Sequence, residues 1–322
     1  MKKLLTVLLV LVLVLGMAAC SKKDTGGSSV IRVGFAQCKA DESDWRIANT
    51  RSVQAAFNVP GYQLTLADSN NDAAKQVADV QGFIDQEYDY IVIAAVNVDG
   101  WDTVLRNAKN AGIPVILVDR TINAPQDLYT CWVGADFFAE GVKATDWMSR
   151  HFGSKPVNVV NLQGQLGASA QVERSRALTE AVEKNANWTL LARQTADWGT
   201  DTAKQIMTSW IQQFGDQINC VYAENDNMAD GAIQALQERG IDVGGADGVA
   251  IISFDANRPY LQMTLDGLIN ANVECNPLHG PKVKSIIDNL QAGRQPQRIE
   301  AVEEEAFFWD TITQSVIDAR QY

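Results

Sequence analysis

Aromatic and charged side chains stand next to each other at two points of this sequence. Trp45 is followed directly by Arg46, and Asp119 is followed directly by Arg120. A guanidinium presents several N–H donors in a rigid fork, a carboxylate accepts hydroxyl protons, and an indole offers a flat apolar face. A sugar needs these three kinds of partner, because its hydroxyls donate and accept while its C–H faces are apolar. The two pairs therefore predict a site for a small sugar.

Each of these residues also has a structural interpretation. Trp45 could pack in the core at the start of an amphipathic helix, and Arg46 could lie on the surface. Asp119 and Arg120 could form a structural ion pair at a junction between lobes. Helix capping explains Asp119 less well, because it ends an apolar run and no obvious helical turn follows it.

Residues suited to other chemistry are scarce. His151 and His279 are the only histidines, and no two cysteines have Cys-x-x-Cys spacing. We therefore expect no metal and no cofactor. A glycosidase would need paired carboxylates such as Asp119 and Asp255, one of them with a raised pKa, but Arg120 favours ionisation of its neighbour. The sequence predicts a binding protein and no enzyme.

The first 30 residues have the layout of an export signal. Met1-Lys2-Lys3 is cationic, the run from Leu4 to Leu15 is apolar but for Thr6, and small residues precede Cys20. This pattern predicts a signal peptide over residues 1–19 and lipid attachment at Cys20, followed by a flexible tether to residue 30. The apolar run is shorter than the roughly 20 residues of a spanning helix. We expect an extracytoplasmic protein held to the cell membrane by its lipid, with secretion without lipid as the alternative.

The net charge and the cysteines bear on the binding partners and on disulfide formation, respectively. The formal net charge of −12 argues against nucleic acid, because nucleic-acid binders concentrate Lys and Arg on one face. An exported protein can form disulfides, and its four remaining cysteines allow three full pairings, none of which the sequence selects. For Cys131 and Cys220, the alternative is that they are unpaired and buried as small apolar residues inside strands. The four are Cys38, Cys131, Cys220 and Cys275.

Apolar runs alternate with helical patterns along the rest of the chain. Runs such as Ile91-Val92-Ile93 and Val249-Ala250-Ile251-Ile252 are apolar on both faces, as parallel strands covered by helices must be. About 290 residues suit two lobes better than one core. We expect an α/β protein of two doubly wound, Rossmann-like lobes with parallel central sheets. No linker separates them, so several short hinge crossings are expected. The predicted lobes are 31–135 plus about 276–305, and about 136–275 plus 306–322.

The same patterns set the expected elements. Strands are expected over 31–36, 62–67, 90–95, 114–118, 157–162, 188–194, 219–222 and 249–254. Helices are expected over 45–57, 73–86, 100–111, 172–184, 200–214, 230–239 and 261–265. Polar residues follow many of these strands, and ligands of such sheets bind beyond the carboxyl ends of the strands.

Several short motifs carry a family resemblance. They include Val33-Gly34-Phe35-Ala36-Gln37, Glu42-Ser43-Asp44-Trp45-Arg46, Val118-Asp119-Arg120, Leu162-Gln163-Gly164 and Val221-Tyr222-Ala223-Glu224-Asn225-Asp226-Asn227-Met228. Together they make the chain, over roughly Ile31 to Gly293, similar to the type I periplasmic sugar-binding proteins that feed ABC importers. This is the ribose and galactose receptor family, and the galactofuranose-binding branch is the most similar part of it.

The resemblance implies a function and a set of residues. It implies a monomer that captures a small sugar between its lobes and hands it to an importer permease; a sensory protein that partners a membrane receptor kinase is the alternative. Trp198 is implied to stack on the sugar opposite Trp45, with Arg176 as a rival to Arg174. The implied ligand-binding residues are Gln37, Glu42, Trp45, Arg46, Asp119, Arg120, Asp136, Arg174, Trp198, Asn225 and Asp255.

The chain departs from the family pattern at two places. Related receptors end a late strand with a polar contact, and here Glu274 or Asn276, or neither, takes that place. The galactofuranose-like receptors carry a cysteine near the position of Pro156, which this chain lacks, so Cys220 is without the partner that the resemblance implies.

Overall fold

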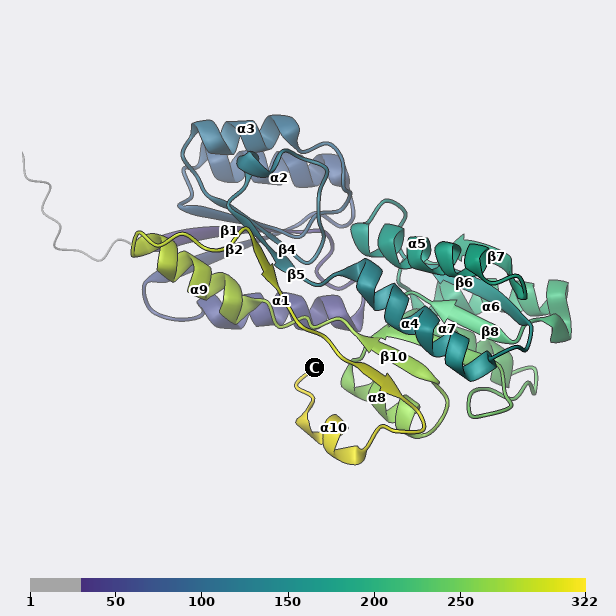
Figure 1. The fold of residues 1–322 in the computed structure, drawn as a ribbon. Helices are drawn as coiled ribbons and strands as arrows, with labels where there is room; N and C mark the ends of the chain where they lie inside the picture. Colours follow the sequence, from purple (N-terminus) through teal and green to yellow (C-terminus); the bar gives the residue numbers. More distant parts are fainter. Residues whose placement is uncertain (1–29) are drawn as a thin grey trace, which may run out of the picture. The chain divides into compact units, whose positions relative to one another are not determined.

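Two six-stranded sheets form the framework of the protein (Figure 1). The computed structural model describes residues 30–322. The predicted signal peptide, the lipidation at Cys20 and nearly all of the tether lie outside these residues. Within the described residues, no helix is long and apolar enough to cross a membrane.

The first sheet is parallel throughout and, with its helices, is called the N-terminal lobe below. Its strand order is β11 (Ile299–Ala301), β5 (Cys131–Gly134), β4 (Val115–Val118), β3 (Tyr90–Ile93), β1 (Ile31–Gln37), β2 (Tyr62–Asp68). Helices α2 (Ala73–Asp85) and α3 (Asp102–Asn110) pack on one face, and α1 (Asp44–Phe57) and α9 (Gly280–Gln291) pack on the other.

The second sheet is parallel except for β12, which pairs antiparallel with β10. This sheet and its helices are called the C-terminal lobe. Its strand order is β12 (Ala306–Phe308), β10 (Ala271–Glu274), β9 (Ala250–Asp255), β8 (Cys220–Ala223), β6 (Val157–Gln163), β7 (Trp188–Thr195). Helices α4 (Phe137–Phe152) and α5 (Ser169–Lys184) cover one face, and α6 (Thr200–Phe214) and α7 (Asp226–Gln237) cover the other. The short helices α8 (Arg258–Leu265) and α10 (Gln314–Ala319) pack beside β12.

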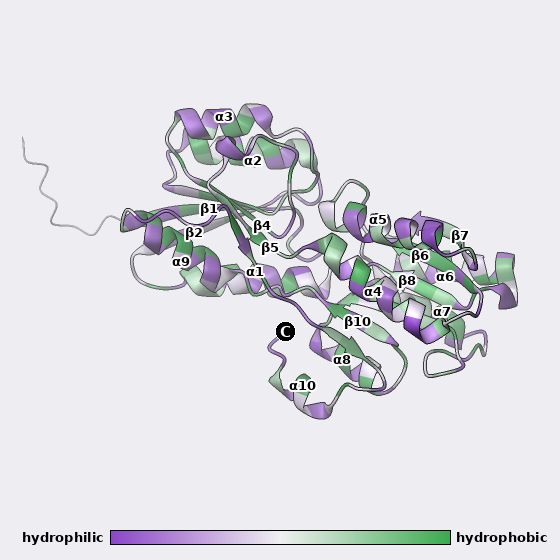
Figure 2. Cartoon of the chain, in the orientation of Figure 1, coloured by the Kyte–Doolittle hydropathy of each residue, from purple (hydrophilic) through white to green (hydrophobic). Residues whose placement is uncertain are grey.

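The alternation of side chains along each strand explains this layering. In β3, Ile91 and Ile93 join the core under α2 and α3, while Tyr90 and Val92 join the core under α1 and α9. Apolar residues on both faces therefore need helices on both faces. Figure 2 shows the result, since helices such as α3 and α9 alternate between hydrophobic and hydrophilic segments. The predicted doubly wound α/β fold is confirmed.

Three connections join the lobes, as the predicted hinge of several crossings requires. They run through residues 135–136 between β5 and α4, residues 275–279 between β10 and α9, and residues 302–305 between β11 and β12. We call them the first, second and third crossing. The four described cysteines are buried free thiols.

Several element boundaries differ from the predictions. Helix α7 begins at Asp226, four residues before the predicted start, because the side chain of Asn225 accepts a hydrogen bond from the backbone of Met228 and caps the helix there. Helix α5 begins at Ser169, three residues before the prediction. The sequence patterns assign no element to α4, where Gly141 allows close packing on Ala177 of α5. Two short 3₁₀ turns, η1 (Gln126–Leu128) and η2 (Gly215–Gln217), complete the fold.

Candidate ligand-binding site

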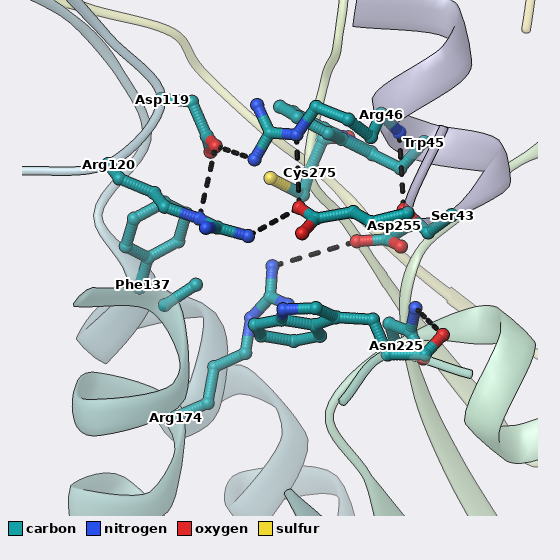
Figure 3. A pocket seen from close by; sticks show the side chains of 13 residues that line it. Ser43, Trp45, Arg46, Asp119, Arg120, Phe137, Arg174, Asn225, Asp255 and Cys275 are labelled. Carbon is teal, nitrogen blue, oxygen red and sulfur yellow. Dashed lines mark hydrogen bonds and ion pairs between the residues drawn. The ribbon is translucent and has the colours of Figure 1, made fainter. Parts of the chain in front are cut away.

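A small polar cavity of about 30 Å³ lies between the lobes, at the carboxyl ends of strands from both sheets (Figure 3). The N-terminal lobe contributes the start of α1 and the residues after β4. The C-terminal lobe contributes α4, α5, the residue before α6, and the ends of β8, β9 and β10. The lining residues are Glu42, Ser43, Trp45, Arg46, Asp119, Arg120, Phe137, Ala170, Arg174, Trp198, Asn225, Asp255 and Cys275.

The backbone is strained at three of these positions. Asp119, Trp198 and Asp255 have positive φ angles of 62°, 66° and 101°, which L-residues seldom adopt. Such a conformation costs on the order of 1–3 kcal/mol and persists only where the surroundings impose it. At Asp119 and Asp255 it turns the chain sharply at the end of a strand, so that the carboxylate faces the cavity instead of starting a helix. Strain at three lining residues is a sign of a functional site.

The N-terminal lobe presents an alternating network of two guanidinium groups and two carboxylates. Arg46 forms an ion pair with Asp119, and its Nε lies 3.2 Å from Glu42 Oε1. Arg120 Nη2 lies 2.5 Å from the same Glu42 oxygen. All four side chains are buried. Burial alone would raise the pKa of Asp119, but Arg46 and Arg120 outweigh it and hold that pKa below its ordinary value.

Arg174 is the central cation of the C-terminal lobe. Its Nε and Nη2 both lie 2.7 Å from Glu140 Oε2, and its Nη1 donates to the carbonyl oxygen of Glu224 at 2.6 Å. Asp255 Oδ1 lies 3.8 Å from Arg174, a looser contact. Burial raises the pKa of Asp255 even though Arg174 opposes the rise, so this carboxyl favours its neutral form. The three guanidinium groups are then matched by three carboxylates, those of Glu42 and Asp119 in the lining and that of Glu140, which pairs with Arg174 outside the lining. This balance suits an uncharged ligand.

Two buried polar atoms at the cavity have no hydrogen-bond partner among the described residues. They are Glu42 Oε2, an acceptor, and Trp198 Nε1, a donor. A buried polar group without a partner costs about 1–3 kcal/mol. Because both residues line the cavity, a ligand there could satisfy both atoms. An acceptor and a donor facing one space match a group of hydroxyls.

The two cavity tryptophans are held differently. The indole of Trp45 donates from Nε1 to the carbonyl oxygen of Cys275 at 2.5 Å, which ties α1 of one lobe to the second crossing. The Arg46 guanidinium lies 4.6 Å from the Trp45 ring centroid. Trp198 packs directly on Gly164, where a Cβ atom would overlap the indole ring. The Arg120 guanidinium lies 5.6 Å from the Trp198 ring centroid.

The structure brings nine of the eleven predicted residues to this cavity and leaves two elsewhere. Gln37 is buried beneath the loop before α1, where its amide donates to Thr50 at 3.1 Å. Asp136 caps α4 by accepting from the backbone of Ala139 at 3.0 Å. Arg176, the rival of Arg174, is exposed and pairs with glutamates of its own helix.

Sequence reasoning missed Cys275, which lines the cavity in place of either neighbour that we considered. Glu274 is engaged by Arg320 and by the Tyr322 hydroxyl at 2.8 Å. The Asn276 side chain accepts from the backbone of Leu278. Glu274 is the last residue of β10 and Cys275 follows it directly, so alternation of side chains at the strand end predicts that the two point in opposite directions, and this signal could have separated them. Phe137, Ser43 and Ala170 complete the lining and had no distinctive signal in the sequence.

The lobes also touch outside the cavity. Asp44, at the start of α1, accepts from the Tyr260 hydroxyl at 2.9 Å and from Asn227 Nδ2 at 3.1 Å. The backbone of Thr121 donates to the Ser169 hydroxyl at 2.9 Å. Each contact joins an N-terminal-lobe residue to a C-terminal-lobe residue. The structure is therefore a form in which the lobes are in contact around the cavity.

Two α/β lobes with a polar cavity between the ends of their sheets define the class of bilobal solute-binding proteins. Comparison with known proteins agrees. The family model described as a periplasmic binding protein domain matches residues 33–279. The chain belongs to this family, and the predicted resemblance to the sugar receptors is confirmed.

Individual relatives refine the comparison. The galactofuranose-binding protein YtfQ of Escherichia coli is 34% identical over 285 residues, which covers 87% of this chain and 89% of the relative. A Mycobacterium smegmatis structure in complex with β-D-fucofuranose has a TM-score of 0.82 and 37% identity, covering 87% of this chain and 92% of that one. The arabinose ABC transporter binding protein of Shewanella sp. ANA-3, bound to α- and β-L-arabinofuranose, has a TM-score of 0.84 and 30% identity, covering 90% and 95%.

Proposed function

We propose that this protein is a non-enzymatic receptor that captures a neutral monosaccharide in its furanose form and delivers it to an ABC importer. The observation that carries the proposal is the pair of unpartnered atoms, Glu42 Oε2 and Trp198 Nε1, in residues that line a cavity where three guanidinium groups balance three carboxylates. A sugar hydroxyl can donate to the first and accept from the second, whereas an anionic ligand would upset the balance.

Furanose ligands are favoured by the relatives. The names of three similar proteins refer to galactofuranose, β-D-fucofuranose and L-arabinofuranose. Nine of the residues that the family resemblance implies line the cavity of this chain. Galactofuranose is the ligand that we propose first.

The proposed mechanism is hinge closure. Without ligand the three crossings let the lobes separate, and a sugar that contacts both lobes favours the closed form. Closure excludes water, so the hydrogen bonds to Arg and carboxylate groups strengthen. Hydrogen bonds to charged groups contribute about 1.5–3 kcal/mol each, so several of them are consistent with affinity in the low-micromolar range or tighter. The importer permease would recognise the closed arrangement of the two lobes.

A panel of sugars tests the ligand. Thermal unfolding is followed with galactofuranose, fucofuranose, arabinose, fructose, ribose and galactopyranose, and positive cases are measured by calorimetry. We expect the furanoses to raise the melting temperature most. If no monosaccharide raises it, the sugar proposal is wrong. Mass spectrometry of the mixture tests the absence of catalysis, since a receptor returns its sugar unchanged.

The membrane anchor is a separate proposal that rests on Cys20, outside the described residues. Lipid attachment needs the thiol of this residue. The variant Cys20→Ser should therefore leave the membrane fraction, while its sugar affinity stays unchanged. Retention of the variant in the membrane would contradict the lipid anchor and leave the sugar site untouched.

A further inference from the structure

Two of the crossings and the first turn of α4 contribute to one cluster beside the cavity, in which Glu140 and Cys275 are buried and Glu304 is half-buried. Glu140 lies in the first turn of α4, directly after the first crossing; Cys275 lies in the second crossing and Glu304 in the third. The thiol sulphur and one oxygen of each carboxyl group lie within 4.8 Å of one another. The two carboxyl groups are therefore neighbours at the hinge.

The hydrogen bonds around the cluster leave one conspicuous gap. Glu140 is 1% exposed, and its Oε2 holds Arg174 at 2.7 Å, yet its Oε1 has no partner among the described residues. Glu304 Oε1 accepts from the backbone N–H of Asn276 at 2.7 Å. Lys143 donates to the main-chain carbonyl of Glu304 at 2.6 Å, so its hydrogen bond goes to the backbone and not to the carboxyl group.

Two ionised carboxylates cannot share such a site. Arg174 is the cation nearest to Glu140, and its contacts go to Glu140, the Glu224 carbonyl and Asp255. The Cys275 thiol is neutral, because burial raises its pKa well above the ordinary value. Like charges this close in a buried site force one group to keep its proton. A bound cation is the alternative, but it would sit beside the Arg174 guanidinium and would meet a protonated thiol.

We propose that Glu304 is protonated at neutral pH and donates a hydrogen bond to Glu140 Oε1, so that a shared proton connects the hinge crossings to Arg174 in the cavity. Glu140 is the ionised partner because it pairs directly with a guanidinium. Glu304 is then a positioning residue. It holds Glu140, and Glu140 orients Arg174. The inference rests on the proposed function only for the step from Arg174 to the sugar.

The pKa shifts agree with this assignment. Burial, and then the neighbouring Glu140, raises the pKa of Glu304 to about 11. Burial raises the pKa of Glu140 as well, and Arg174 opposes that rise. The groups that face the pair are Glu140, Arg174, Cys275, Lys143 and, through Arg174, Asp255.

Infrared spectroscopy of the full chain tests the proton directly and needs no sugar. At pH 7.5 the difference spectrum between wild type and Glu304→Gln should show the carbonyl stretch of one protonated carboxyl group, lost in the variant. The matched control Glu303→Gln changes the exposed neighbouring residue and should remove carboxylate intensity instead. Loss of a carboxylate band in Glu304→Gln would overturn the proposal.

The pH dependence of stability is the second test. The folded pKa of Glu304 lies above its unfolded value, so the folded state keeps a proton that the unfolded state loses, and stability falls as pH rises from about 4.5 towards 11. The melting temperature of wild type should therefore fall more steeply than that of Glu304→Gln between about pH 6 and about pH 10. Parallel curves would contradict the shared proton.

Sugar affinity tests the positioning role. Glu304→Ala leaves Glu140 without its donor and should weaken binding by about tenfold. Glu304→Gln can still donate to Glu140 and accept from Asn276, so it should restore most of the affinity. Equal affinity of wild type and Glu304→Ala would overturn the positioning role. If no sugar binds at all, the proposed function is wrong, and the infrared result still decides the protonation of Glu304.

Discussion

Several residues at the cavity adopt conformations that are locally unfavourable. Asp119, Trp198 and Asp255 adopt left-handed backbone conformations, and Glu42 and Trp198 each keep a buried polar atom unpaired. Both features cost free energy in the unliganded protein. Such features are expected where the free energy of ligand binding offsets them.

Replacing Trp198 by Phe tests the unpaired donor. The Phe ring keeps a flat apolar wall but removes Nε1, which has no partner among the described residues. We expect sugar affinity to fall by about tenfold, measured by calorimetry, while the melting temperature of the ligand-free protein falls less than in Trp45→Phe, because no hydrogen bond within the protein is lost. The contrasting variant is Trp45→Phe, which removes the hydrogen bond to Cys275 and should lower the melting temperature itself. A ligand-free destabilisation by Trp198→Phe equal to that of Trp45→Phe would contradict this reading.

Gly164 sets the position of the same indole. A methyl group at residue 164 would overlap the Trp198 ring, although the backbone there suits any residue. Gly164→Ala should therefore displace Trp198 and weaken sugar binding by about tenfold or more, with a changed tryptophan fluorescence spectrum. Gly82→Ala is the matched control, because a Cβ atom at position 82 of α2 meets only the end of Gln86 at 3.9 Å. An unchanged spectrum in Gly164→Ala would show that the ring does not need this space.

The sequence could predict the charged and aromatic residues of the site, because their chemistry is unusual where they stand. Asp119 with Arg120 ends a strand without starting a helix, and both residues line the cavity. Gln37 and Asp136 also follow strands, but local partners engage them, and sequence alone does not distinguish a residue that caps or packs from one that binds. Cys275 was not predicted as a cavity residue, because the sequence does not distinguish an apolar residue that lines a cavity from one that packs in a core.

At the scale of elements, the starts of helices do most of the positioning. Ser43 caps α1 by accepting from the backbone of Arg46 at 3.2 Å, and Asn225 caps α7 while it lines the cavity. The predicted start of α7 was too late because the helix opens with two polar residues, Asp226 and Asn227, and Asp230 follows soon after. The element types were nevertheless predictable, since apolar runs of strand length alternate with helical patterns.

Helix α1 also carries a polar contact that joins the lobes. Tyr260 of α8 donates to Asp44 at 2.9 Å, and neither residue lines the cavity. Tyr260→Phe should weaken sugar binding about fivefold through faster dissociation, because the closed form loses the bond to Asp44, whereas the bond from Asn227 within the C-terminal lobe is lost in both forms. Stopped-flow kinetics measure the rate. Tyr88→Phe is the control, since its hydroxyl bonds Thr65 within one lobe at 2.9 Å and its loss should leave dissociation unchanged. An unchanged rate in Tyr260→Phe would mean that this contact does not stabilise closure.

At the scale of the whole molecule, the hinge concentrates buried ionisable groups. Glu140, Glu304 and His279 all lie in or beside the crossings. Such pairings between distant segments are not visible in a sequence, because residues 140 and 304 come together only when both lobes have formed. The fold class follows from local patterns, whereas the protonation of the hinge follows from tertiary contacts.

His279 makes stability depend on acid in a predictable direction. It is 3% exposed, and its Nδ1 lies 3.2 Å from Asn49 Nδ2, an arrangement that needs a neutral imidazole accepting at Nδ1. Burial lowers its pKa to about 4, although Asp119 opposes this. Between the unfolded value near 6.5 and about 4, the unfolded chain binds a proton that the folded chain refuses, so stability falls as pH falls. Integrated over that window, the loss is roughly 3 kcal/mol.

The variant His279→Gln isolates this contribution. Its amide oxygen can accept from Asn49 and has no proton to gain, so the free energy of unfolding from denaturant titrations should fall less steeply than in wild type as the pH drops from 6.5 to about 4. His151→Gln is the comparison, because His151 is only partly buried, stacked on Trp147, and should change the slope less. Carboxylates elsewhere titrate equally in all three proteins and cancel in the differences. Identical slopes for wild type and His279→Gln would mean that the folded protein accepts a proton at His279, and that the Asn49 contact breaks without cost.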